Sequence, residues 1–244
     1  MFSSFYTAAS GMEAQLKKVE ILSQNLANAN SISYKQQRIS FQELMYQKID
    51  QMNIGTGTKI GEVERVFKIG AMERTNSPLD VAIQGRGFFK VQTPEGKTVY
   101  TRDGRFNVEN GELVIKDIGK TGIKVPQDVT GVTIEEDGTV VGYKGKDKVE
   151  IGKIKIYDFV NPNGLKGIGK NAFEWTENAG KPIEIEPGKG DNPKIAAGFL
   201  EKSNVNVITQ MMDIVSSQRN YELVAKCVES ADQIARMANQ MKKH

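Results

Sequence analysis

Two long amphipathic helical patterns, one near each end of the chain, constrain the fold more than any other feature. In residues 2–28 and 207–241, apolar side chains recur at alternating steps of three and four residues. Such steps keep side chains on one face of a helix, and a sustained heptad pattern turns that face toward a partner helix. These side chains belong to Phe2, Phe5, Ala9, Met12, Leu16, Val19 and Leu26, and to Val207, Met211, Ile214, Tyr221, Val224, Cys227, Ala231, Ile234, Ala238 and Met241. We therefore expect long terminal helices that pair as a coiled coil or bundle.

Local signals predict where the two helices end and begin. Asn and Ser are frequent in residues 28–33, where they compete with helical hydrogen bonds and favour turns, so the first helix should end there. Ser203, Asn204 and Asn206 are suitable caps for the second helix, which should run toward Met241. A periodic pattern longer than about 25 residues favours a coiled coil or bundle over an ordinary packed helix.

The segment after the first helix predicts a short second helix followed by a connector. Its apolar residues are Phe41, Leu44, Met45, Ile49 and Met52. Glycines interrupt this pattern from residue 55 onward, and we expect residues 53–78 to form a loop or extended connector.

From residue 79 the apolar pattern changes to a period of two, which is typical of strands. Asp-Gly and Asn-Gly pairs separate these strands, and such pairs suit tight hairpins. Residues 161–194 are rich in Gly, Asn and Pro and are expected to be irregular. The sequence thus predicts a mixed α and β fold. Its predicted parts are a helical assembly domain (1–35 plus 203–244), a connector (36–78 plus 195–202) and an antiparallel β-rich outer domain (79–194).

Composition disfavours most kinds of chemistry. The 244 residues carry 33 basic and 30 acidic side chains, a net charge of +3, so neither nucleic acid nor an anionic membrane is an expected partner. With one Cys and one His, a zinc site or a Ser–His–Asp triad is not expected. Cys227 lies on the apolar stripe and is interpreted as a small buried side chain, and His244 is a poor general base. We expect no enzyme activity, no cofactor, no membrane insertion and no cleavable signal peptide.

Two alternatives remain open from the residues alone. One is a secreted β-domain protein with helical oligomerisation ends that binds or acts on cell-wall carbohydrate. A glycosidase needs paired carboxylates, for which Asp80, Asp103, Glu136 and Asp137 are available. The other is a soluble adaptor or chaperone that pairs its ends and never polymerises.

Four motifs stand out along the chain: Ile21–Asn30 with Tyr34 and Lys35, Leu79–Phe89, Tyr100–Phe106, and Gly198–Val207 with Gln218–Glu222. In sequence and in order, they resemble the motifs of the bacterial flagellar rod and hook proteins. The resemblance covers both ends of the chain and the start of its middle. Distal-rod and proximal-rod paralogues both remain open, because residues 46–78 are short for the distal type while the C-terminal motifs are closer to it.

The resemblance implies a structural subunit of the flagellar basal-body rod. Family members leave the cell through the flagellar export apparatus without a cleavable signal peptide, and they form a shaft that crosses the periplasm. Their terminal helices pack with further copies, in a helical homopolymer, and with other rod and hook proteins. The residues expected at this assembly interface are Phe5, Met12, Leu16, Val19, Leu26, Met211, Ile214, Tyr221, Val224, Ala231 and Ile234.

Overall fold

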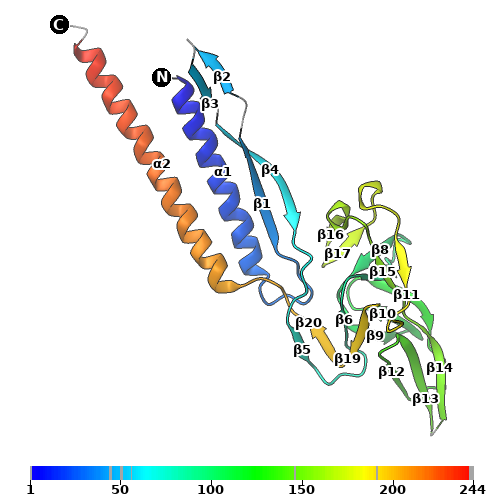
Figure 1. Ribbon diagram of the computed structural model, residues 1–244. Coiled ribbons are helices and arrows are strands. Elements are labelled where there is room, and N and C mark those ends of the chain that lie inside the picture. The colour runs from blue at the N-terminus through cyan, green and yellow to red at the C-terminus, as the bar shows by residue number, and fades with distance from the viewer. Residues whose placement is uncertain are drawn as a thin grey trace. The chain divides into compact units, whose positions relative to one another are not determined.

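The computed structural model describes residues 2–43, 46–49, 52–55, 57–145, 147–190 and 192–241. They form two compact units, coloured along the chain in Figure 1. Unit 1 comprises Met1–Ala29, Gln36–Val66 and Val205–His244, and unit 2 comprises Asn30–Lys35 and Phe67–Asn204. The predicted order of an N-terminal helix, an antiparallel β-rich middle and a C-terminal helix is confirmed. The predicted three-part domain division stays a prediction.

Two helices form the long axis of unit 1. Helix α1 spans Phe2–Ala27 and helix α2 spans Val207–Met241. They contact each other and run antiparallel, side by side in Figure 1. Helix α1 ends just before the Asn-rich turn, and the Asn206 side-chain oxygen accepts a hydrogen bond from the Thr209 N–H (3.1 Å) at the start of α2. Both predicted helix boundaries are therefore confirmed. Among the described residues, neither helix is apolar enough over a sufficient length to cross a membrane.

A β-hairpin replaces the predicted second helix. Strands β1 (Gln37–Glu43) and β4 (Thr58–Arg65) pair antiparallel and contact α1, and β2 (Tyr46–Ile49) pairs with β3 (Met52–Gly55). The prediction was wrong for these strands, and residues 44, 45, 50 and 51 lie outside the described residues. Ile39 and Phe41 alternate with polar neighbours, and this period of two prevailed over the weaker helical spacing.

Unit 2 is built from antiparallel strands around one long sheet, ordered β16-β17-β8-β7-β11-β10-β9, with β15 and β18 attached beside β7. Short strands and two 3-10 turns also occupy residues 161–194, which were expected to be irregular. The bounds are β5 Met72–Arg74, β6 Val81–Gln84, β7 Phe88–Gln92, β8 Thr98–Thr101, β9 Phe106–Glu109, β10 Glu112–Ile115, β11 Gly119–Lys124, β12 Gly131–Ile134, β13 Thr139–Lys144, β14 Asp147–Lys153, β15 Ile156–Asp158, η1 Pro162–Gly164, β16 Lys166–Gly169, β17 Ala172–Glu174, η2 Glu177–Ala179, β18 Ile183–Ile185, β19 Lys194–Ala197 and β20 Phe199–Glu201.

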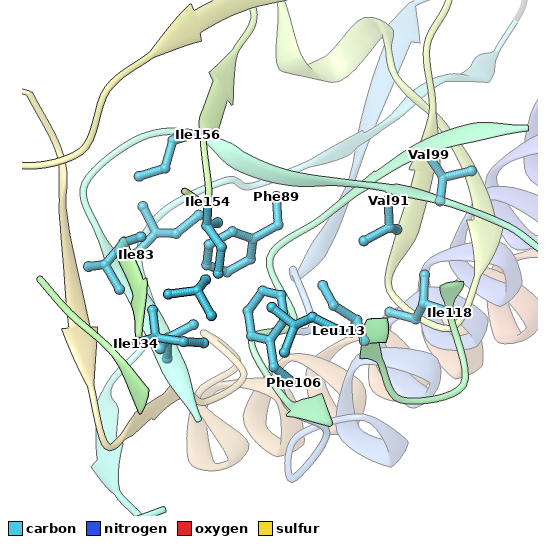
Figure 2. Packing of buried hydrophobic residues seen from close by; sticks show 14 of the residues in the cluster. Ile83, Phe89, Val91, Val99, Phe106, Leu113, Ile118, Ile134, Ile154 and Ile156 are labelled. Atoms are coloured by element: carbon cyan, nitrogen blue, oxygen red, sulfur yellow. The ribbon is translucent and has the colours of Figure 1, made fainter. Parts of the chain in front are cut away.

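Two apolar clusters fill unit 2, one on each side of β7. Because successive side chains of a strand point to opposite faces, Phe88 joins one cluster and Phe89 the other. Figure 2 shows the larger cluster, in which Phe89 lies near Phe106 and Ile154. The smaller cluster includes Phe88, Tyr100, Phe159, Leu165 and Phe173. The aromatic side chains of these strands therefore fill the core of unit 2.

Candidate functional site

Helix α2 exposes large apolar side chains along the side that is turned away from its buried residues. In its first turns Ile208 is 72% exposed and Met212 is 68% exposed, and Met211 and Val215 are exposed beside them. We call these four residues the outer patch. Farther along α2, exposed apolar side chains recur at Leu223, Ile234, Met237 and Met241. Exposed apolar surface of this extent on one helix is typical of an interaction site.

The predicted interface residues divide between half-buried and exposed positions. Three are largely exposed: Leu16 (56%), Met211 (51%) and Ile234 (63%). The other eight are half-buried: Phe5, Met12, Val19, Leu26, Ile214, Tyr221, Val224 and Ala231. Within the described residues, the predicted interface thus consists of a half-buried set of side chains and an exposed set.

Cys227 and three residues of the outer patch were not placed correctly by sequence reasoning. The Cys227 side chain is exposed, so its interpretation as a buried side chain was wrong. Ile208, Met212 and Val215 were missed because the heptad template follows one row of apolar residues and skips a second row beside it. Adjacent apolar pairs such as Ile208 with Val207 and Met212 with Met211 were the available signal.

A buried amide in unit 1 joins three elements. Asn25, near the end of α1, is fully buried. Its side-chain nitrogen donates to the Gln37 carbonyl oxygen (2.8 Å) and to Gln210 Oε1 (3.0 Å), and its Oδ1 accepts from the Gln37 N–H (2.8 Å). Gln210 lies in the first turns of α2 and is 2% exposed. One side chain therefore links α1, the start of β1 and α2.

A second polar cluster, in unit 2, consists of Lys35, Arg102 and Glu201, and we call it the ion network. All three side chains are almost completely buried. Glu201 Oε1 accepts from Lys35 Nζ (2.6 Å) and from the Gly70 N–H (2.8 Å), while Glu201 Oε2 accepts from Arg102 Nε (2.7 Å). A Cβ at Gly70 would overlap the Lys202 carbonyl oxygen, so glycine allows this close approach. One carboxylate thus ties together three separate segments of unit 2.

Arg102 connects this network to the turn before β7. Its terminal nitrogens donate to the carbonyl oxygens of Gly87 (2.8 Å), Gly85 (3.0 Å) and Ile83 (3.2 Å). The Ser33 hydroxyl donates to the Arg102 carbonyl oxygen (2.8 Å). The motifs around Lys35, Gly85, Arg102 and Glu201, far apart in the sequence, therefore meet at one place in unit 2.

Sequence reasoning did not single out the members of the ion network as a site. Each of the three is followed directly by a polar or charged residue, Gln36, Asp103 and Lys202, so the local sequence carried no signal of burial. Their pairing spans 166 and 99 residues, so the contacts depend on the completed fold.

Burial and neighbouring charges shift the pKa values in the network. Burial, reinforced by the charge of Arg102, lowers the pKa of Lys35 to about 8 despite its contact with Glu201. Burial alone would raise the pKa of Glu201, but the charges of Arg102 and Lys35 and the hydrogen bonds from Lys35 and Gly70 outweigh it and hold this pKa below its usual value. Two cations share one carboxylate, so the protonated network holds a surplus positive charge.

We expect unit 2 to become more stable as the pH rises from 7.5 to 9.5. The unfolded chain keeps the Lys35 proton up to pH 10.5 whereas the folded chain releases it near pH 8, so the unfolded state binds more protons in this window. The gain in the free energy of unfolding should reach up to about 2 kcal/mol. Urea unfolding at each pH measures it. Lys35→Met should remove the rise in the free energy of unfolding with pH, whereas the surface variant Lys97→Met should keep it. If the free energy of unfolding of Lys35→Met still rose with pH as in the parent, Lys35 would not be the group responsible.

Two of the four carboxylates named for the carbohydrate-directed alternative, Asp103 and Asp137, hold structural contacts. Asp103 is buried and binds Arg105 Nε and a terminal nitrogen of the same guanidinium (2.6 Å). Asp137 accepts from the Thr139 N–H and hydroxyl, and these hydrogen bonds hold its pKa below the usual value. In the part of the chain that the structure describes, no group of three or more His, Cys, Asp or Glu side chains is arranged to hold a metal.

The two terminal helices contact each other and leave an apolar side exposed, and the buried charges of unit 2 hold its fold together. These features are typical of a protein that works by assembly. Comparison with known families gives three matches. Residues 5–35 match the flagella basal body rod protein family, residues 82–142 match the flagellar hook protein FlgE/F/G D1 domain, and residues 196–241 match the C-terminal region of the flagellar basal body rod FlgEFG proteins.

Similar proteins extend over the whole chain. The flagellar basal-body rod protein FlgG of Caulobacter vibrioides is 35% identical, over 97% of this chain and 98% of its own length. The protein of the same name from Borreliella burgdorferi is 36% identical over 100% of both chains, and that from Bacillus subtilis is 31% identical over 96% of this chain and 97% of its own. The chain belongs to the flagellar basal-body rod protein family. It is a structural subunit of the rod and not an enzyme, and the comparisons give no support to the carbohydrate-directed alternative.

Proposed function

We propose that this chain polymerises through its terminal helices into a hollow shaft that transmits torque. The observation that carries the proposal is the outer patch of α2 with the exposed apolar residues beyond it, because a helix already packed on α1 retains this surface for another molecule. Burial of such side chains contributes about 25 cal/mol per Å². Contacts between unlike surfaces of identical subunits generate a helical polymer when they do not close.

The finer features of this proposal concern pairing, position and export. Helices α1 and α2 pair as a coiled coil. Residues 1–35 and 203–244 act as the assembly domain, and residues 79–194 act as the outer domain. Residues 36–78 and 195–202 connect the two. The interface takes in Leu16, Met211 and Ile234, which are exposed, and the half-buried residues of the predicted set through coiled-coil contacts. The partners are further copies and other rod and hook proteins. The chain passes through the flagellar export apparatus, the shaft crosses the periplasm, and neither nucleic acid nor a membrane is a partner.

Cells that lack this chain are expected to build basal bodies whose rod is missing or truncated. Electron microscopy of basal bodies purified from the deletion strain measures this, with a strain complemented by the intact gene as the control. The point of truncation distinguishes a proximal from a distal position, because every segment beyond the missing subunit loses its base. An intact rod in swimming cells would refute the proposal.

A further inference from the structure

We propose that Asn25 and Gln210 form a register latch, which sets where α2 lies along α1. Gln210 Oε1 accepts the hydrogen bond of the Asn25 amide at 3.0 Å, and both side chains are almost completely buried. Asn25 lies on α1 and Gln210 on α2, so a shift of α2 by one turn along α1, about 5.4 Å, takes the two groups out of hydrogen-bond range. A single buried polar pair is a known means of fixing register between helices.

The latch joins two points that are each fixed by other bonds. On α1, Asn25 is held by its two hydrogen bonds to the Gln37 backbone, both 2.8 Å long. On α2, the carbonyl oxygen of Asn206 accepts the Gln210 N–H (3.0 Å), and the Asn206 side chain caps the same turn. Asn25 is therefore fixed to α1 and β1, and Gln210 moves with the first turns of α2. If α2 slides along α1, the distance between the two amides increases.

The contacting face of α2 also carries half-buried apolar side chains, among them Ile214, Tyr221 and Val224, whose contacts are non-directional, and several small residues. Ser217 is fully buried, and Ala231 and Ala235 are half-buried on the same side. Small side chains pack similarly when a helix slides by one turn, so they discriminate weakly between registers. Among the described residues, the Ser217 hydroxyl has no hydrogen-bond partner, although it is as buried as Gln210. It therefore adds no directional contact to this face, whereas the Asn25–Gln210 hydrogen bond does.

A slip of one turn, about 5 to 6 Å along the axis, would break the Asn25–Gln210 hydrogen bond and leave the buried Gln210 oxygen without this donor, while Asn25 would keep its bonds to the Gln37 backbone. Buried unpaired polar groups are disfavoured strongly enough to exclude such a state. The outer patch occupies the same turns of α2 as Gln210 but points away from the buried side. The latch therefore sets the position along α1 at which the outer patch is presented. Only this last consequence rests on the proposed assembly function.

Distance measurement on the full-length monomer tests the latch. Nitroxide labels are placed at Glu13→Cys on α1 and Gln233→Cys on α2, both exposed positions, in a Cys227→Ser background. The parent is expected to give one narrow distance distribution by electron–electron double resonance. Gln210→Leu, or the more flexible Gln210→Met, is expected to add a second population displaced by about 5 Å, or one helical turn.

Ser217→Ala is the matched control, since it removes a buried polar group from the same face that has no partner among the described residues. It should leave the distance unchanged. A broad distribution in the parent, an unchanged distribution in both Gln210 variants, or an equal displacement in Ser217→Ala would each overturn the latch. These readings are taken on monomer, so they are independent of whether the chain polymerises. Far-ultraviolet circular dichroism verifies that each variant keeps its helices.

Discussion

Replacing Glu201 with glutamine is expected to lower the free energy of unfolding of unit 2 by about 3 to 5 kcal/mol. The substitution keeps the shape of the side chain and an oxygen that can accept from Lys35 and Gly70, but it removes the only negative charge of the ion network. Lys35 and Arg102 would then remain buried together without a counter-charge. An uncompensated buried charge costs far more than the loss of a surface pair.

The protein provides its own probe for this measurement. Trp175 is the only tryptophan, it lies in unit 2, and its indole N–H donates to the Gly180 carbonyl oxygen (2.7 Å). Its fluorescence during urea unfolding therefore reports on unit 2, while circular dichroism reports mainly on α1 and α2. The expected result is a lower midpoint in fluorescence with the slope unchanged.

Two further variants separate charge burial from a general effect of losing a carboxylate. Glu184→Gln removes an exposed carboxylate of unit 2 that binds Lys155 and Tyr157, and it should change the free energy of unfolding far less than Glu201→Gln does. Lys35→Met combined with Glu201→Gln removes one of the two uncompensated cations, so it should recover part of the loss. If Glu184→Gln and Glu201→Gln lowered the free energy of unfolding equally, or if the double variant recovered none of the loss, uncompensated charge in the ion network would not be the cause.

The parts of the fold that were predicted correctly depend on local signals. Asn206 caps α2 through a bond to a residue three positions away, and the Asn-rich turn ends α1 at Ala27. Two hairpins of unit 2 follow Asn-Gly and Asp-Gly pairs, β9–β10 at Asn110-Gly111 and β12–β13 at Asp137-Gly138, and the backbone preferences of these pairs act over two residues. The Asp103-Gly104 pair instead separates β8 and β9, which do not pair with each other. The hairpin of β1 and β4 was missed because its register pairs Gln37 with Arg65, a contact between distant residues that no local pattern specifies.

The candidate sites were predicted less well for the same physical reason. Glu201 acquires its role only when Lys35 and Arg102 arrive from elsewhere in the chain, and Asn25 only when Gln210 does. The apolar stripe of α2 was identified, but periodicity alone cannot decide which side of a helix meets α1 when apolar residues occupy more than one side. The exposed fraction of each side chain decides it, and it identifies Ile208 as the most exposed member of the outer patch.

Replacing Ile208 with aspartate should prevent assembly while leaving both units folded. Ile208 is 72% exposed, so the substitution removes little burial from the isolated chain, and it places a negative charge in the first turn of α2, where the helix dipole favours one. In a polymer the same position would be buried. The loss of an apolar side chain worth roughly 1.5 to 3 kcal/mol is then added to the cost of burying an unpaired charge.

The expected result is a rise of at least about 100-fold in the concentration needed for self-association, which corresponds to about 2.7 kcal/mol. Sedimentation velocity over a range of concentrations measures this rise, and complemented cells should lose the rod and motility. Asn220→Asp is the matched control, because it adds the same charge at an exposed position of α2 outside the outer patch, and it should assemble normally. If Ile208→Asp associated at the parent concentration and supported swimming, the outer patch would not be the contact that builds the shaft. If both variants failed equally, added charge on α2 would explain the defect and the position of Ile208 would not.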